Sequence, residues 1–533
     1  MTIDHSLVQS ALLQTQLRMR YPAGKYSNGR EFSGVDELRP LTLLPLDLPE
    51  LFTYSALANQ VPPPVRSRPR FEVQAATVLH SVYGVSAWYE EWVSFWREHF
   101  SVFGYDGNVG PYLPHWDREV IRKHCLGNFF QFLEASTQHP CMLYYLNNRS
   151  SRAGNANENF ARELFELHTL GQGAYLHFLY SDWRKVPGAL QAKPTGYIDE
   201  DVYEAARAFT GWTVEDGAAI GGGQRLPKTG RFTYVAQWHD PYQKRVLATE
   251  LRSHAPALAD GLAVLRLCAN HPASAQHLAK KLVRRFVSEE MRPDWVASTA
   301  QVFLDRRAAP NQLAWVLAHL VQLAENVPAA QKQKVRRPTR LLGAFVRATR
   351  LPFHLGEGQI LAVLERAGPP IYGWPSPDGP PDDNEWYLGA AYLRQRHELV
   401  LGLAQNWWGT GEFNPFERTS AQPSYREFLG RWEEDLFGEL RPELSQALLM
   451  AQRINTEERV SDPKRARYLV GLLACSPSFQ TEVVLPSVAE AKRVLDLPIE
   501  SLMPSKKGAP VKKRTPSQPT TLSDSMSQNP VAS

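Results

Sequence analysis

The stretch SAWYEEWVSFWREHF, residues 86–100, gives the clearest indication of the fold class in this sequence. Its large side chains recur at three- and four-residue spacings, which would place them on one face of an α-helix: Trp88, Trp92, Phe95, Trp96 and His99. Apolar residues recur at the same helical spacing in most segments between residues 118 and 476. The sequence therefore predicts a mainly α, multi-helix globular domain.

Three regions follow from this pattern. Residues 1–70 end in the proline-rich, basic stretch VPPPVRSRPR, which disfavours regular structure, so we expect an irregular N-terminal arm. The helical domain is predicted to span residues 71–485. We expect residues 486–533 to form a C-terminal segment with a disordered basic tail.

The region 214–250 differs from the helical segments around it. Three successive glycines at 221–223 favour a flexible turn, and RFTYVAQW at 231–238 shows some alternation of apolar and polar residues. We therefore predict a small β-hairpin insertion in this region.

The composition is that of a folded protein and argues against a nucleic-acid binder. The chain has 533 residues, of which 43% are hydrophobic and 11% aromatic, so a sizeable core is expected. Its formal net charge is +4, but residues 503–533 hold five cations and one anion, which leaves the remaining body neutral. A nucleic-acid binder usually concentrates positive charge on its fold, so we do not expect nucleic acid as a partner.

Neither a membrane span nor a secretory signal is predicted from the sequence. No run of about 18 apolar residues occurs, so we expect no membrane span. The N-terminus lacks the apolar core of a secretory signal, and the cysteines show neither a CxxC pair nor a zinc-finger spacing. We therefore expect a soluble cytoplasmic protein whose cysteines are isolated and buried.

Two segments concentrate carboxylates and arginines between bulky apolar residues: NENFARELFELHTLG at 157–171 and DEDVYEAARAFTGW at 199–212. In the first, Glu163 and Glu166 lie on a stripe beside the apolar one, and Arg162 is four residues from Glu166. Such pairs stabilise an exposed helix by about 0.2–0.5 kcal/mol each, so a purely structural role explains them well. A catalytic role is the alternative, because buried carboxylates must be paired, protonated or bound to metal.

If the two helices pack together, their acids and arginines form either an ion-pair network or a carboxylate pocket. In a pocket, Glu163 or Glu166 would act as general base or metal ligand, because burial raises the pKa of a carboxyl group toward neutrality. Glu204 would complete the pocket, and Arg162 and Arg207 would orient the base or an anionic substrate. The sequence does not decide between the two arrangements.

The stretch WHDPYQKRVL, residues 238–247, is a second candidate site. His239, Asp240 and Lys244 follow a predicted strand and precede a helix, where functional side chains often lie. In an active site, His239 would shuttle protons. A turn in which Asp240 caps the following segment is the alternative.

The spacing of possible ligands argues against a known metal motif. Glu163 and His168 are five residues apart, which matches neither the Glu-x-x-His pairs of di-iron bundles nor HExxH. A divalent metal held by His99, Glu163 and His239 is therefore only a secondary expectation. For His99 the alternative is a hydrogen-bonded core residue, because it lies beside Trp96 on an aromatic helix face.

Seven motifs of this sequence occur in the order found in a large bacterial family known as domain of unknown function eighteen hundred. The chain resembles this family from about residue 82 to residue 480. The motifs are FWREHFSV, NENFARELFELHTLG, DVYEAARAFTGW, WHDPYQKRVL, HPASAQHLAKKLVRRFV, KVRRPTRLLGAFVRA and SPSFQ.

The resemblance implies a mostly helical fold and no established activity. Members of that family are often encoded beside proteins similar to alkaline phosphatases and sulfatases, which implies a partner of that kind. Arg97 and Glu98 stand where the family often has His-Asn, and this chain lacks the export signal of many relatives. The family's characteristic polar positions are His99, Asn157, Glu158, Asn159, Arg162, Glu163, Glu166, Asp201, Glu204, Arg207, His239, Asp240 and Lys244.

Two functions remain open at this point. The first is a soluble enzyme, with hydrolysis as the reaction class, whose polar pocket lies between the two carboxylate helices. The second is a non-catalytic accessory protein whose charged residues only pair with one another and whose surface binds a sulfatase- or phosphatase-like partner. A concave pocket with at least one unpaired group would favour the enzyme, and complete pairing would favour the accessory protein.

Overall fold

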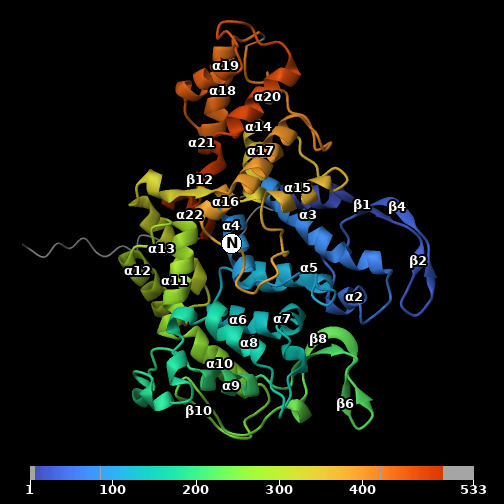
Figure 1. Cartoon of the computed structure of the whole chain (residues 1–533), viewed down its shortest axis with the longest axis vertical. Coiled ribbons are helices and arrows are strands. Elements are labelled where there is room, and N and C mark those ends of the chain that lie inside the picture. Colours follow the sequence, from blue (N-terminus) through green and yellow to red (C-terminus); the bar gives the residue numbers. More distant parts are fainter. Residues whose placement is uncertain (1–5, 85, 421, 496–533) are drawn as a thin grey trace, which may run out of the picture.

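The computed structural model describes residues 6–84, 86–420 and 422–495, and helices dominate them (Figure 1). Each sheet in this part of the chain consists of two antiparallel strands. The prediction of a mainly α fold is confirmed. The predicted disordered basic tail falls almost entirely in residues 496–533, which lie outside the described residues.

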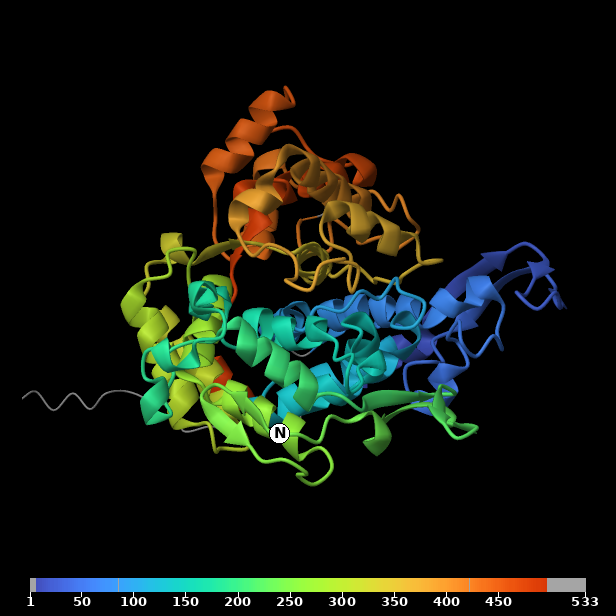
Figure 2. The ribbon, with the colours of Figure 1, turned by 60° about the horizontal axis from the view of Figure 1, so that its bottom comes forward.

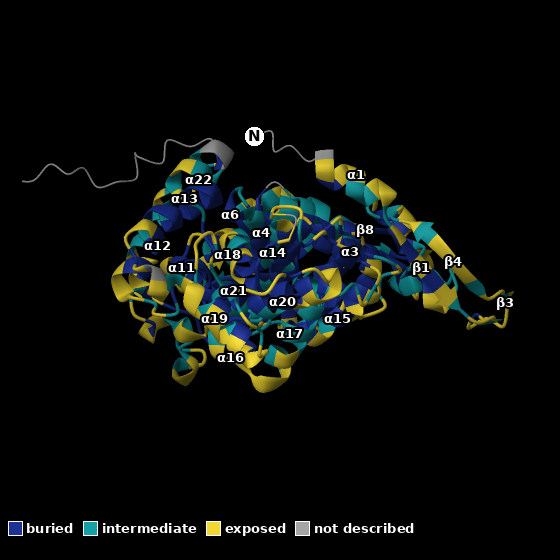
Figure 3. Cartoon of the chain, turned by 90° about the horizontal axis from the view of Figure 1, so that it is seen from above, coloured by how far each residue is buried: buried dark blue, intermediate teal, exposed yellow. Residues whose placement is uncertain are grey.

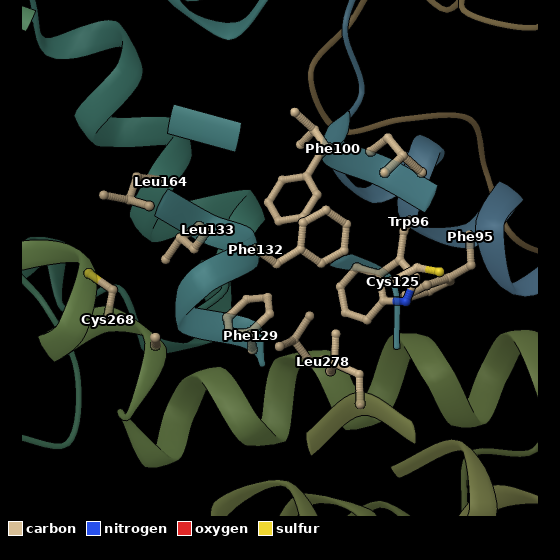
Figure 4. Close-up of a cluster of buried hydrophobic side chains, with 14 of the residues drawn as sticks. Phe95, Trp96, Phe100, Cys125, Phe129, Phe132, Leu133, Leu164, Cys268 and Leu278 are labelled. Carbon is tan, nitrogen blue, oxygen red and sulfur yellow. The ribbon is translucent and has the colours of Figure 1, made fainter. Parts of the chain in front are cut away.

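One large hydrophobic cluster occupies the lower part of the molecule in Figure 1. Phe100 and Trp96 pack against Phe132 with ring centroids 4.8 and 5.2 Å away (Figure 4). The aromatic face predicted for residues 86–100 is therefore the face that is buried. The helices that contribute to this cluster are α4 (Ala87–His99), α6 (Phe129–Gln138), α7 (Pro140–Tyr145), α8 (Glu158–Glu163), α9 (Asp199–Ala208), α10 (Ala259–Ala269), α11 (Pro272–Phe286), α12 (Pro293–Asp305), α13 (Gln312–Glu325) and α22 (Val488–Leu495).

A second hydrophobic cluster forms the upper part of Figure 1, and Figure 2 shows this part lying along one side of the lower one. Helix α3 (Arg68–Tyr83) contributes to both clusters and packs against α14. The two helices approach closely at Gly343, where an added Cβ atom would lie 2.4 Å from the carbonyl oxygen of Ser81. The other helices of the upper part are α14 (Pro338–Thr349), α15 (Gln359–Ala367), α16 (Asn384–Leu388), α17 (Ala390–Ala404), α18 (Tyr425–Phe437), α19 (Pro442–Ala451), α20 (Pro463–Ala474) and α21 (Pro477–Gln480).

The N-terminal segment is ordered, so the expectation of an irregular arm over residues 1–70 is wrong for its described part. Leu17 and Met19 alternate with exposed residues and turn their side chains inward, as a half-buried strand requires. Arg68 of α3 then holds the hairpin, because its guanidinium donates to the backbone carbonyl of Leu17 at 3.3 Å. The elements are α1 (Ser6–Gln14), β1 (Gln16–Tyr21) paired with β4 (Val35–Pro40), β2 (Gly24–Lys25) paired with β3 (Glu31–Phe32), and α2 (Leu48–Phe52).

The proline-rich stretch 61–70 also forms regular structure. It contains the short 3₁₀ helix Pro63–Ser67 and the first turn of α3, in which Pro69 lies at the start of the helix. Proline is tolerated there because the first backbone N–H groups of a helix have no partner within it. The prolines therefore mark where α3 begins.

The predicted hairpin insertion is present. Strand β5 (Trp212–Asp216) pairs with β8 (Lys228–Tyr234), and the short strands β6 (Ala219–Gly221) and β7 (Gln224–Arg225) extend the hairpin to its tip. The three glycines at 221–223 all have positive φ angles, which suits a tight turn. A second small hairpin follows, formed by β9 (Lys244–Val246) and β10 (Thr249–Leu251).

The remaining short elements lie between these parts. Helix α5 (Leu113–His115) belongs to the lower part, and β11 (Gln333–Val335) pairs with β12 (Thr481–Val483) near the junction of the two parts. Figure 3 shows that α3 and α14 in the middle are mostly buried, whereas α19 is mostly exposed. None of the described helices combines the length and the apolarity needed to cross a membrane.

Candidate functional site

The two carboxylate helices, α8 and α9, pack against each other. Phe160 and Phe209 meet edge to face with ring centroids 5.0 Å apart. Arg162 of α8 lies 3.9 Å from Asp199 of α9, and the Tyr175 hydroxyl donates to Asp199 at 2.7 Å. The packing that the carboxylate pocket required is therefore present, but the acidic side chains divide into two separate groups.

Asp201 of α9 supports a backbone turn. Its carboxylate accepts the backbone N–H of Ile198 at 2.9 Å and that of Leu247 at 2.6 Å. Leu247 and Ala248, the two-residue turn between β9 and β10, both have positive φ angles, which non-glycine residues adopt only when they are held there. Burial raises the pKa of Asp201 to about 6, although both hydrogen bonds act to lower it.

Glu204 and Arg207, further along α9, form a closed ion-pair group with Asp240. The Arg207 guanidinium binds Asp240 through Nε and Nη2 at 2.8 and 3.1 Å. Its Nη1 binds both carboxylate oxygens of Glu204 at 2.7 and 2.8 Å. The backbone N–H of Arg245 donates to Glu204 as well. Four of the five guanidinium N–H groups of Arg207 are therefore directed at Glu204 and Asp240.

Lys244 and His239 meet at Asp260. The Lys244 ammonium is fully enclosed, and it donates to Asp260 at 2.7 Å and to two backbone carbonyl groups. His239 donates from Nδ1 to the carbonyl of Thr210 at 2.9 Å and has Nε2 3.4 Å from Asp260. Although burial alone would raise it, the pKa of Asp260 is lowered by hydrogen bonds from His239 and Lys244.

We call these side chains the α9 network. Each of its members has a hydrogen-bond or ion-pair partner in the network or in the adjacent backbone, so the network fixes the positions of α9 and the two hairpins. The members are Asp201, Glu204, Arg207, His239, Asp240, Lys244 and Asp260.

Three predicted binding residues lie at the N-terminal end of α8. The Asn157 side chain accepts the backbone N–H of Asn159 at 2.9 Å and thereby caps the helix. Glu158 forms a 3.5 Å ion pair with Arg162 four residues later, and the two side chains are 41% and 34% exposed. These residues stabilise the exposed N-terminal end of α8.

The side chains of Glu163 and Glu166 make no hydrogen bond or ion pair with any described residue, although both residues are half-buried. Burial, together with the negative charge of Glu166, raises the pKa of Glu163 to about 7, and the charge of Asp378 acts in the same direction. The positive charge of Arg162 lowers the pKa of Glu163, but by less than burial and the two negative charges raise it. Glu163 is therefore a carboxyl group that exchanges protons near neutral pH.

After α8 the helix widens into the π-helical turn Leu164–His168. This turn frees two backbone carbonyl groups, which accept hydrogen bonds from imidazole rings of other helices. The Leu167 carbonyl binds Nε2 of His277 at 3.1 Å, and the His168 carbonyl binds Nε2 of His99 at 3.2 Å. Single π-helical turns frequently occur at functional sites, because they redirect backbone and side-chain groups in this way.

Lys281 of α11 completes the contacts of His99. Its Nζ lies 3.1 Å from Nδ1 of His99, and since Nε2 of His99 donates to a carbonyl, Nδ1 is the acceptor. Burial and the nearby Lys281 charge hold the pKa of His99 well below its usual value, so this imidazole is neutral. Burial lowers the pKa of Lys281 to about 8, although neighbouring carboxylates act against the shift.

The long loop between α15 and α16, residues 368–383, is rich in proline and glycine and covers this region. Gly379 has a φ of +77°, and an added Cβ atom would lie 2.4 Å from the carbonyl oxygen of Glu98 at the end of α4. Asp382 accepts from Arg285 at 3.2 Å and from Arg337 at 2.8 Å. These contacts fasten the loop to α4, α11 and α14.

The same loop brings Asp378 to the end of α8. Tyr145 of α7 donates its hydroxyl to the carbonyl of Pro375 at 2.8 Å, which holds the loop on this side. The Asp378 charge acts on the pKa of both Glu163 and Lys281. We call the resulting group the acid–base cluster, and its members are His99, Glu163, Glu166, His168, His277, Lys281 and Asp378.

A metal site built from His99, Glu163 and His239 is not formed. His99 is bound to Lys281 and a carbonyl, whereas His239 belongs to the α9 network. Within residues 6–495, apart from the two undescribed positions, no group of three or more His, Cys, Asp or Glu side chains is arranged to hold a metal ion. The expectation was wrong because the two histidines face different surroundings.

These observations define a class: a mainly helical protein in which a paired ion network lies beside two half-buried glutamates without a partner among the described residues and a hydrogen-bonded His99–Lys281 pair. The chain belongs to the family described as Protein of unknown function (DUF1800), whose profile matches residues 7–481. The resemblance inferred from the motifs is thus confirmed, and the match extends to the N-terminal hairpin. Neither the curated proteins nor the solved structures contain a match to the chain.

Four members of the acid–base cluster were not predicted as site residues: His168, His277, Lys281 and Asp378. Two of them carried a detectable signal, because His277 and Lys281 are four residues apart in HPASAQHLAKKLVRRFV and therefore share a helix face. Asp378 lies in the loop between α15 and α16, where no site residue was predicted. Its proximity to α8 depends on how that loop folds back.

Proposed function

We propose that the chain is a hydrolase whose general base is Glu163. The supporting observation is the state of this carboxyl group: it is half-buried, has no partner among the described residues and has a pKa raised to about 7. A general base is most effective when its pKa lies near the working pH, because it is then both available and sufficiently basic. Such groups mark candidate active sites.

In the proposed reaction, Glu163 takes a proton from water, and the resulting hydroxide attacks the substrate. Lys281, with a pKa of about 8, is largely protonated at neutral pH and donates a proton to the leaving group. His99 holds the Lys281 ammonium in place through the 3.1 Å hydrogen bond. Glu166 keeps the pKa of Glu163 high by its charge.

The structure limits which predicted residues enter this proposal. Arg162 remains a candidate for holding an anionic substrate, since its two ion pairs are long, at 3.5 and 3.9 Å. Glu204, Arg207 and His239 are not candidates for substrate binding or catalysis, because their side chains are engaged in the α9 network.

The test compares Glu163→Gln with the wild-type chain on chromogenic carboxylic esters, phosphate esters, sulfate esters and glycosides. We expect hydrolysis of one class, and a loss of about 10²–10⁴-fold in kcat/KM in the variant, as for other general bases. Glu200→Gln is the matched control, because Glu200 is also a half-buried glutamate with a raised pKa but lies on α9. Its activity should stay within about twofold of wild type.

Two results would contradict the proposal. One is hydrolysis that Glu163→Gln leaves intact, which would place the reaction elsewhere. The other is the absence of hydrolysis of every substrate class by a folded wild-type chain over the range from pH 5 to pH 9.

The second candidate function is a non-catalytic accessory protein for a sulfatase- or phosphatase-like partner. The complete pairing of the α9 network favours it, because saturated ion pairs fix geometry and perform no chemistry. Co-expression of the chain with a sulfatase- or phosphatase-like candidate, followed by size-exclusion chromatography, tests it. A cytoplasmic location remains a prediction that cell fractionation would check.

A further inference from the structure

A groove with a volume of about 840 Å³ lies beside the acid–base cluster, between α10, α11, the β9–β10 turn and the two loops around residues 170–174 and 192–195. His277 and Gly171 belong to its wall. Its partly exposed apolar lining includes Ala263, Leu267 and Ala273, whereas Leu170, Leu247 and Leu251, which also line it, are almost fully buried. A volume of about 300–1,000 Å³ is typical of pockets that hold small organic ligands.

The charged residues of this groove all have one sign. Lys193, Arg266 and Lys280 come from three different elements, are exposed, and make no ion pair with any residue that the structure describes. Aspartate and glutamate are absent from the groove lining. Arg266 is held in place by the Phe130 ring, with its guanidinium carbon 4.9 Å from the ring centroid. The groove therefore combines an apolar wall with a cationic rim.

The character of the wall narrows the ligand class. No aromatic side chain other than imidazole lines the groove, so a nucleotide would lack the ring stacking on which base recognition usually depends. The chain's own residues 503–533 carry five cations and one anion, so they would be repelled by Lys193, Arg266 and Lys280. An aliphatic chain suits the partly exposed apolar lining, and a single anionic head group suits the cationic rim.

We infer that this groove binds a free single-chain anionic amphiphile, with its aliphatic chain against Ala263, Leu267 and Ala273 and its head group between Arg266 and Lys280. This binding does not depend on the hydrolase proposal, because it requires no chemistry of Glu163 or Lys281. The groove and the acid–base cluster share His277, so an occupied groove would place the ligand next to the cluster.

The experiment is calorimetric titration of the full chain with dodecanoate below its micelle concentration, and with dodecyltrimethylammonium, which has the same chain length and the opposite charge. We expect dodecanoate to bind with one site per chain and the ammonium compound to bind at least about tenfold more weakly. The double variant Arg266→Glu, Lys280→Glu should weaken dodecanoate binding by about tenfold or more, since two favourable charge interactions become repulsive. Lys464→Glu, an exposed charge reversal on α20, is the matched control and should stay within about twofold.

A second variant tests the apolar wall. Leu267→Glu introduces a charge into the half-buried part of the groove without removing a cation, and we expect it to abolish dodecanoate binding. Thermal denaturation of each variant establishes that it is folded. Equal binding of the two amphiphiles, or unchanged binding by the double variant, would overturn the inference. So would binding only to anionic phospholipid vesicles, or only to an acidic peptide, since the ligand would then be a membrane or a protein.

Discussion

The α9 network and the acid–base cluster consist of similar residues and lie on neighbouring helices, yet their glutamate side chains differ in whether they are paired. In the α9 network, Arg207 uses three of its guanidinium nitrogens on Glu204 and Asp240, and Lys244 has three acceptors. In the acid–base cluster, Glu163 and Glu166 have no partner among the described residues. The difference lies in the neighbouring segments and not in the residue types.

This comparison shows how burial produces either rigidity or reactivity. A buried carboxylate that meets arginine and lysine is stabilised in its charged form and loses its capacity to exchange protons near neutral pH. A half-buried carboxylate that meets a second carboxylate is destabilised in its charged form, as the pKa of about 7 for Glu163 indicates. The first arrangement stabilises the fold, and the second makes a group available for proton transfer at the expense of stability.

The largest expected effect comes from breaking the α9 network at its most enclosed charge. Lys244→Met leaves Asp260 buried with only His239 beside it, so the free energy of unfolding should fall by about 3 kcal/mol, as is typical when one partner of a buried pair is removed. Urea denaturation measures the change. Lys185→Met is the control, because Lys185 is 72% exposed and its pair with Asp182 should contribute less than about 1 kcal/mol. A loss below about 1 kcal/mol for Lys244→Met would show that the network is not structural.

The next effect concerns the contact between the π-helical turn and α11. Gly171 has a φ of +87°, and a Cβ atom would lie 2.5 Å from Nδ1 of His277. Gly171→Ala should therefore lower the free energy of unfolding by about 2 kcal/mol and displace the imidazole. Gly154→Ala is the matched control, since Gly154 has a φ of +78° but open space around it, so only the backbone strain of about 1 kcal/mol remains.

Thermal and urea denaturation of both glycine variants separate the two contributions. Adding His277→Ala to Gly171→Ala removes the imidazole atoms that lie 2.5 and 2.8 Å from the added Cβ atom and should restore part of the lost stability. Equal losses for the two single variants would mean that the His277 contact adjusts without cost, and the acid–base cluster would then be less rigid than the structure indicates.

The third expected effect is a gain in the free energy of unfolding, whereas the first two are losses. The pKa of Glu163 is raised from 4.5 to about 7 in the folded chain, so the unfolded chain binds fewer protons between these pH values and the fold loses stability as the pH rises through them. Glu163→Gln removes this loss. After allowance for solvent screening of a half-exposed group, we expect the variant to be more stable by about 1 kcal/mol at pH 8 and equal to wild type at pH 4.

A pH series of urea denaturation curves measures this gap. It should open between about pH 4.5 and pH 7 and stay constant above that range. A variant that is less stable than wild type at pH 8 would mean that Glu163 has a favourable partner in solution and belongs with the α9 network.

The smallest effect is expected at the exposed end of α8. Glu158→Gln removes a 3.5 Å ion pair between side chains that are 41% and 34% exposed, and it should cost about 0.3 kcal/mol. Thermal denaturation at low and high salt checks this, because an exposed pair is screened. A loss above about 1 kcal/mol would extend the structural network from α9 to α8.

Local patterns in the sequence predicted the helices well and the N-terminal segment poorly. The aromatic spacing of Trp92 and Trp96 predicted a buried helical face, and both side chains are fully buried. The prolines around the start of α3 were interpreted as a sign of irregular structure, whereas Pro69 lies in the first turn of the helix. A proline is compatible with either interpretation until the following residues are seen to continue as a helix.

The candidate site was predicted in part. Glu163, Glu166 and His99 were named from their positions on helix faces, and the structure places all three in the acid–base cluster. Their grouping with His239 and Glu204 was not correct, since those residues belong to the α9 network. Spacing shows which side chains share a helix face but not which segment covers that face.

The sequence by itself determined that the chain is mainly helical, which faces are buried and where acids and bases concentrate, because helical periodicity and composition are properties of neighbouring residues. Only the tertiary structure decided which charges are paired. Lys281 lies 182 positions from its partner His99, and His277 lies 110 positions from the carbonyl that it binds. Contacts over such separations depend on how the helices pack, and the same glutamate can be saturated or reactive according to the segment that reaches it.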